Sequence, residues 1–172
     1  MRPRAILAVT AVAAASLMAG GWGAASAQAA TTTCTWGGTP AEPTGKVWYT
    51  GQGITNTPST EPLPFVATGP LAGGCSGTLT YRGVQGTGST CAFGPFEAKV
   101  IGLRGVVRAA GDNAVGLVPA LLYDKAGNVV GSENPQVLTS GTEEKNFGFV
   151  AVCESPEGFK EGNFSSVIEL FG

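Results

Sequence analysis

Catalytic chemistry in this chain has to proceed without histidine, because none of its 172 residues is a histidine. This absence excludes Ser-His-Asp and Cys-His nucleophile systems, histidine general bases and almost all common zinc or copper sites. Carboxylates, lysine, tyrosine and serine remain, and none of them stands at a spacing that supplies an activating neighbour. We therefore expect no catalytic residues and a protein that is not an enzyme.

Carboxylate pairs are the one acid–base system that this composition allows, since a glycosidase needs only an acid and a base. The acidic residues are scattered along the chain, and the adjacent pair Glu143 and Glu144, beside Lys145, is interpreted as a solvated loop. A histidine-free, carboxylate-dependent hydrolase is therefore the enzyme alternative. It would require two acidic groups that converge in a pocket, one of them with a raised pKa.

Metal binding is not expected either. Oxygen-rich segments occur at Asp124 with Asn128, at Asp112 with Asn113, and at residues 132–134. Calcium requires six to eight oxygens in a shaped loop, and none of these segments follows the D-x-[DN]-x-[DN]-G pattern. Ordinary turn chemistry explains Asp, Asn and Gly at such positions. The expectation is no metal and no cofactor.

An aromatic residue near the N-terminus of the mature chain offers a candidate binding surface. Trp48 shares a strand phase with Lys46 and Thr50, opposite Val47 and Tyr49. If the phase of Trp48 faces solvent, an exposed indole can stack on a sugar ring or anchor a protein partner. We therefore take Lys46, Trp48 and Thr50 as candidate binding residues.

A proline-rich segment is the second candidate surface. Pro58, Pro62 and Pro64 lie in the stretch 56–64, where each proline fixes φ and removes a hydrogen-bond donor. We expect an exposed, extended loop. Such a preset backbone suits a secreted protease inhibitor that presents Pro58 to Pro64, while a plain connecting loop is the alternative.

The N-terminus has the pattern of a secretory signal peptide. A short basic start is followed by an apolar run from Ala5 to Ala19 and by small residues that end at Ala29. The run is shorter than a membrane span needs. We expect cleavage of residues 1–29, no membrane anchor, and release of a single domain, residues 30–172, outside the cell. The composition, rich in Ala, Gly, Thr and Val, points to a bacterial source.

Four cysteines lie in the mature part, and an even count in an exported chain predicts two disulfides. Sequence alone leaves three pairings open. A glycine-rich segment between two of the cysteines favours a nested arrangement, Cys75 with Cys91 and Cys34 with Cys153. Trp36, two residues after Cys34, is expected to be buried against a disulfide.

Charge gives little support for nucleic acid as a partner. Without the leader the chain has eight basic and twelve acidic residues, a net charge of −4. Arg82, Arg104 and Arg108 look scattered along the chain. Such a field disfavours nucleic acid and anionic membranes. The partner remains unknown, with a protein or a polysaccharide as candidates.

The elements that must position these residues are short strands. The chain contains 27 glycines and 11 prolines, which interrupt any long helix. Apolar residues alternate with polar ones in four segments, 46–50, 78–82, 96–100 and 163–170.

Two further runs, Leu117 to Tyr123 and Phe147 to Val152, are apolar on both phases and are interpreted as central strands. A turn at Asp124 to Asn128 predicts a hairpin. Nine or ten strands at short intervals favour an all-β, single-domain antiparallel β-sandwich of Greek-key or immunoglobulin-like type. The function that fits is a secreted, non-enzymatic binding module, with the inhibitor and the hydrolase as alternatives.

Overall fold

Nine strands and one helix form in the part of the chain that the computed structural model describes, residues 30–112, 119–139 and 148–172. The strands are β1 (Thr32–Trp36), β2 (Gly45–Tyr49), β3 (Leu63–Gly73), β4 (Gly77–Gln85), β5 (Pro95–Ile101), β6 (Arg108–Asp112), β7 (Ala120–Tyr123), β8 (Val129–Thr139) and β9 (Glu161–Leu170). The helix, α1, spans Gly148–Glu154.

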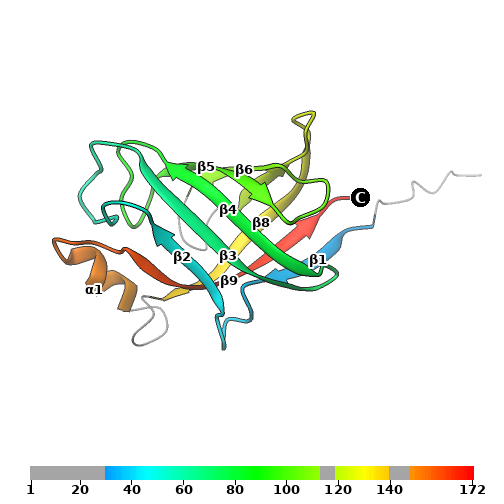
Figure 1. The fold of residues 1–172 in the computed structure, drawn as a ribbon, viewed down its shortest axis with the longest axis horizontal. Helices are drawn as coiled ribbons and strands as arrows, with labels where there is room; N and C mark the ends of the chain where they lie inside the picture. The colour runs from blue at the N-terminus through cyan, green and yellow to red at the C-terminus, as the bar shows by residue number, and fades with distance from the viewer. Residues whose placement is uncertain (1–29, 113–118, 140–147) are drawn as a thin grey trace, which may run out of the picture.

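The strands belong to one sheet that closes on itself (Figure 1). Each strand from β2 to β9 pairs antiparallel with the next one along the chain, and β9 pairs back with β2. These eight strands make an up-and-down antiparallel barrel, and β1 is a ninth strand outside the ring. The expectation of a β-sandwich is therefore wrong. Closure pairs the edges of β2 and β9 with each other, whereas two separate sheets would leave such edges unpaired.

The outside strand β1 and the strand β2 lie end to end between the same two neighbours. β1 pairs with residues 166–170 of β9, and β2 pairs with residues 161–164. Between them the chain loops out and returns, and this requires Gly37 at φ 77°. A Cβ at Gly37 would lie 2.7 Å from the carbonyl oxygen of Phe164. This close approach places Trp36 inside the barrel.

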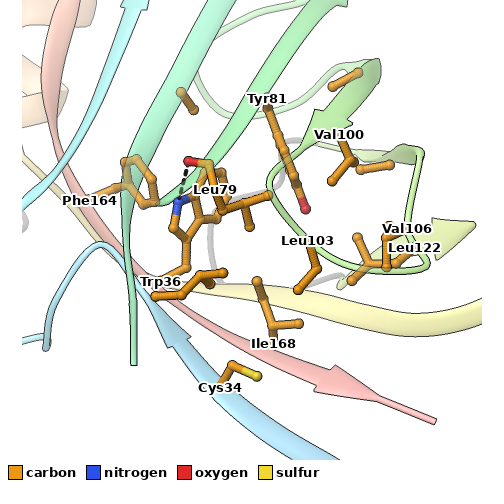
Figure 2. Packing of buried hydrophobic residues seen from close by; sticks show 14 residues of the cluster. Cys34, Trp36, Leu79, Tyr81, Val100, Leu103, Val106, Leu122, Phe164 and Ile168 are labelled. Atoms are coloured by element: carbon orange, nitrogen blue, oxygen red, sulfur yellow. Dashed lines mark hydrogen bonds between the residues drawn. The ribbon is translucent and has the colours of Figure 1, made fainter. Parts of the chain in front are cut away.

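One half of the barrel is filled by apolar side chains. Trp36 is its centre, with ring centroids 4.5 Å from those of both Tyr81 and Phe164. Its indole Nε1 donates to the carbonyl oxygen of Leu79 at 3.2 Å (Figure 2). Cys34 belongs to the same buried cluster. The expected burial of Trp36 is confirmed, since the residue is 2% exposed.

A second apolar cluster closes the end of the barrel where α1 lies (Figure 1). Ile54 and Phe159 form an isolated antiparallel bridge there, and both are 2% exposed. The amide of Asn56 donates to the carbonyl oxygen of Cys153, at the end of α1, at 3.1 Å. The loop after β2 and the segment after α1 thus form a plug over this end.

Two disulfides are present, as expected, but their pairing is not the predicted one. Cys34 is bonded to Cys75 and Cys91 to Cys153, with Cα–Cα distances of 5.4 and 6.1 Å. Cys75 and Cys91 do not meet, because β4 runs the length of the barrel between them and carries them to opposite ends. The first bridge ties β1 to the β3–β4 connection, and the second ties the β4–β5 connection to α1.

The alternation in the four segments is confirmed. Leu79 and Tyr81 in β4, and Phe164 and Ile168 in β9, all face the interior. The hairpin is also confirmed: the Asp124 side chain accepts from the amide of Asn128 at 2.9 Å in the turn between β7 and β8.

The run Phe147 to Val152 is not a central strand, because Gly148–Glu154 is helical. A short run that is apolar on both phases fits either element, and the closed barrel offers it no free edge to join. Of the run Leu117 to Tyr123, residues 120–123 form β7, and the residues before Pro119 lie outside the described part.

The proposed leader, residues 1–29, also lies outside the described residues. In the residues that are described, no helix has the length and apolar character needed to cross a bilayer. Two disulfides are typical of an oxidising, extracytoplasmic compartment.

Candidate functional site: a cavity inside the barrel

The centre of the barrel holds a cavity of about 140 Å³, which lies between the two apolar clusters. Small residues on the inward phase create it. Glu133 of β8 pairs with Ala120 of β7, and Gly111 of β6 is next in the same inward row, with its backbone against Ala120. Gly111 and Ala120 carry no side chain beyond Cβ, so the space in front of Glu133 stays open.

The wall of the cavity is mainly aromatic and aliphatic. Seven aromatic rings from the barrel and the plug line it: Trp36, Tyr49, Phe65, Tyr81, Phe96, Phe159 and Phe164. An eight-stranded barrel has an interior that side chains just fill or that holds one small ligand. An apolar cavity of about 150 Å³ in another protein binds benzene. The volume here therefore suits a molecule with one ring.

Glu133 places a carboxyl group in this apolar surrounding. The residue is 4% exposed, and its side chain accepts a hydrogen bond from the Ser166 hydroxyl of β9. Burial raises the pKa of Glu133 to about 7, although the Ser166 hydrogen bond acts in the opposite direction. No lysine or arginine is among the described residues that line the cavity. Near neutral pH both the protonated and the ionised form of this carboxyl group are therefore populated.

Two tyrosines share the interior with Glu133. The Tyr49 hydroxyl donates to Gln85 Oε1 at 2.7 Å, and burial raises the Tyr49 pKa. Burial also raises the pKa of Tyr81, and the negative charge of Glu133 raises it further. The Tyr81 hydroxyl has no hydrogen-bond partner among the described residues. Both phenols are therefore neutral over the pH range in which Glu133 titrates.

Asp112, at the end of β6, lines the same cavity as Glu133. The prediction of a turn at residues 132–134 is wrong, because these residues lie inside β8. Pro135 and polar neighbours concealed that strand. The hairpin alone gave no signal for Glu133, because a regular register through its turn pairs Leu122 with Val130 and turns Glu133 outward. The β-bulge between Leu122 and Tyr123 instead pairs inward Leu122 with Gly131, and this shift turns Glu133 inward.

The predicted binding residues Lys46, Trp48 and Thr50 lie elsewhere, on the outer wall at β2. Lys46 Nζ donates to Asn163 Oδ1 at 2.5 Å. Trp48 is half-buried, and its paired positions in the neighbouring strands are Val66 and the exposed Glu161. The other phase of β2 faces the cavity.

The same outer row gathers cations that look scattered in the sequence. Arg82, Lys99 and Arg108 occupy directly paired positions on β4, β5 and β6. The Arg108 guanidinium lies 3.5 Å from a Glu97 carboxylate oxygen and 3.9 Å from the centroid of the Tyr123 ring. The register of the barrel therefore makes one basic stripe outside it.

The proline-rich segment is exposed at Pro58 and Pro62, while Pro64 already belongs to β3. Its middle is attached to the turn before β5: the Ser59 amide donates to Ser89 O at 2.9 Å, and the Gly88 amide donates to Ser59 O at 2.8 Å. A hollow of about 590 Å³ is lined by residues of the segments 55–60 and 153–156.

Within the described residues, no three His, Cys, Asp or Glu side chains gather closely enough to hold a metal ion. Comparisons of the chain with protein-family models, with curated proteins and with solved structures find no match.

Proposed function

We propose that this chain is a secreted, non-enzymatic binding protein that holds one small, largely apolar molecule inside its barrel. The observation that carries the proposal is the cavity of about 140 Å³, with seven aromatic rings and one buried carboxyl group in its wall. Ligand sites typically combine apolar walls with a few placed polar groups. Here Glu133 with Ser166, and Tyr49 with Gln85, are the polar groups.

Titration calorimetry with three one-ring probes, toluene, benzyl alcohol and benzylamine, tests this proposal. At least one probe should bind, and Ala120→Leu should abolish binding because the larger side chain fills the space in front of Glu133. The matched control is Ala110→Leu, on the neighbouring strand but on the opposite phase, outside the barrel. Equal binding by the two variants, or no binding by the wild type, would overturn the proposal.

An enzyme that uses carboxylates is the second candidate, because Asp112 and Glu133 line the same cavity and the pKa of Glu133 is raised to about 7. The volume favours binding instead, since it has no room for a sugar ring on each side of a glycosidic bond. We expect no hydrolysis of phenyl acetate above the buffer rate. Turnover that both Glu133→Gln and Asp112→Asn abolish would establish the enzyme.

A protein or polysaccharide partner at Trp48, and protease inhibition by the segment Pro58 to Pro64, stay predictions. Both surfaces lie outside the barrel and are independent of the cavity.

A further inference from the structure

Among the described residues that line the cavity, the charged side chains are all acidic. Its described lining includes two acidic residues, Glu133 and Asp112, and no lysine or arginine. The cations of the barrel strands stand on the outward phase of their strands, where they are exposed or half-buried: Lys46, Arg82, Lys99 and Arg108. A buried carboxylate is costly when nothing compensates its charge. No described residue places a cation beside Glu133, so the charge of this carboxylate is compensated there only by a proton or by a cationic ligand.

The aromatic wall is suited to the same ligand charge. The faces of aromatic rings carry negative potential and attract cations, most strongly where water is excluded. The rings also hold one another in place: Phe65 lies 6.2 Å from Tyr49 and 5.9 Å from Phe96 between centroids, and Tyr49 lies 6.3 Å from Phe159. A wall that is already packed loses little side-chain entropy when a ligand enters.

We propose that the ligand of the cavity is a small organic amine, whose ammonium group pairs with the Glu133 carboxylate while its apolar part packs against the aromatic wall. This inference rests on the proposed function and names its ligand class. Glu133 accepts one hydrogen bond, from Ser166, among the described residues, and a carboxylate has capacity for more. The volume limits the amine to one ring or a short alkyl chain.

The amine requires ionised Glu133, so its affinity depends on pH. The neighbours of Glu133 in the barrel are Ala120 on β7, Ser166 and Ile168 on β9, and Tyr81 on β4. Tyr49 and Asp112 are the other titratable groups at the cavity. Because the tyrosines stay neutral, Glu133 dominates the titration near pH 7. A neutral ligand that accepts a hydrogen bond would instead prefer protonated Glu133, and its affinity would fall as pH rises.

Calorimetric titrations of the wild type with benzylamine, benzyl alcohol and toluene at pH 5.5 and pH 8 test the inference. Benzylamine should bind at least tenfold more tightly than either neutral probe at pH 8, the factor of one charge-assisted hydrogen bond. Its affinity should fall by about 30-fold at pH 5.5, where about 3% of a group with a pKa of about 7 is ionised. Glu133→Gln should remove both the preference and the pH dependence.

Glu169→Gln is the matched control, since Glu169 lies on β9 next to the same strand but is exposed. It should leave all affinities unchanged. If toluene or benzyl alcohol binds as tightly as benzylamine, the amine is wrong while the binding function stands. If none of the probes binds, both proposals fail. A benzylamine affinity that survives in Glu133→Gln places the cation elsewhere and overturns the inference.

Discussion

Replacing Glu133 by Gln should change how the stability of this protein depends on pH. The folded state raises the pKa of Glu133 from 4.5 to about 7, so between these values the folded protein binds a proton that the unfolded chain has released. The free energy of unfolding of the wild type therefore falls as pH rises through this window and is level above it. The size is about 3 kcal/mol, because each pKa unit corresponds to about 1.4 kcal/mol.

Glu133→Gln carries no charge at any pH and should lack this slope. Its free energy of unfolding should be similar to that of the wild type near pH 4.5 and up to about 3 kcal/mol higher at pH 7.5, or about 10 °C in melting temperature. Asp124, whose pKa is lowered by its hydrogen bonds with Asn128, loses its contribution only below this window, as pH falls.

Urea unfolding at half-unit steps from pH 4.5 to 7.5 measures the effect, with exposed Glu169→Gln as the control that keeps the wild-type slope. The same pH slope in the wild type and in Glu133→Gln would show that the carboxyl group is hydrated rather than buried, and would refute the reasoning about the cavity wall.

Two further predictions concern the aromatic residues and the cysteines. Trp36→Ala should lower the free energy of unfolding by about 3–5 kcal/mol, because it empties the centre of the core. Trp48→Ala, on the outer wall, should lower it by about 1 kcal/mol or less. Similar losses for the two variants in urea titrations would place both indoles in the core. Protein collected from the culture medium should have the intact mass of residues 30–172 less four hydrogens, and peptide mapping should recover the two bridges of the structure. A start at Met1 would contradict cleavage, and a mapped Cys75–Cys91 bridge would contradict the barrel arrangement.

Local patterns in the sequence were sufficient for the strands that alternate. In segments such as 78–82 and 96–100, period-two alternation identifies both the strand and its inward residues, because one face of a barrel wall packs in the apolar interior and the other contacts solvent. The absence of histidine limits the chemistry in the same direct way. These properties depend only on near neighbours along the chain.

Properties that depend on distant neighbours were not predictable in this way. Sandwich and barrel share the same strand pattern, and the difference is whether β9 pairs with β2, more than 110 residues apart in the chain. The disulfide pairing follows from that closure, because the barrel decides which cysteines reach the same end. The helix at Gly148–Glu154 also depends on it, since a closed sheet has no edge for a further strand.

The candidate site shows the same division most clearly. The sequence by itself determined that the protein contains few carboxylates, no histidine and a hairpin at Asp124 to Asn128. The bulge between Leu122 and Tyr123, which turns Glu133 inward, is a feature of the structure. Only the tertiary structure decided that Gly111 and Ala120 stand beside Glu133 and leave space there, and that residues from the plug cover it. The physical reason is that a cavity is a property of the residues across the barrel, and the sequence records only the residues along each strand.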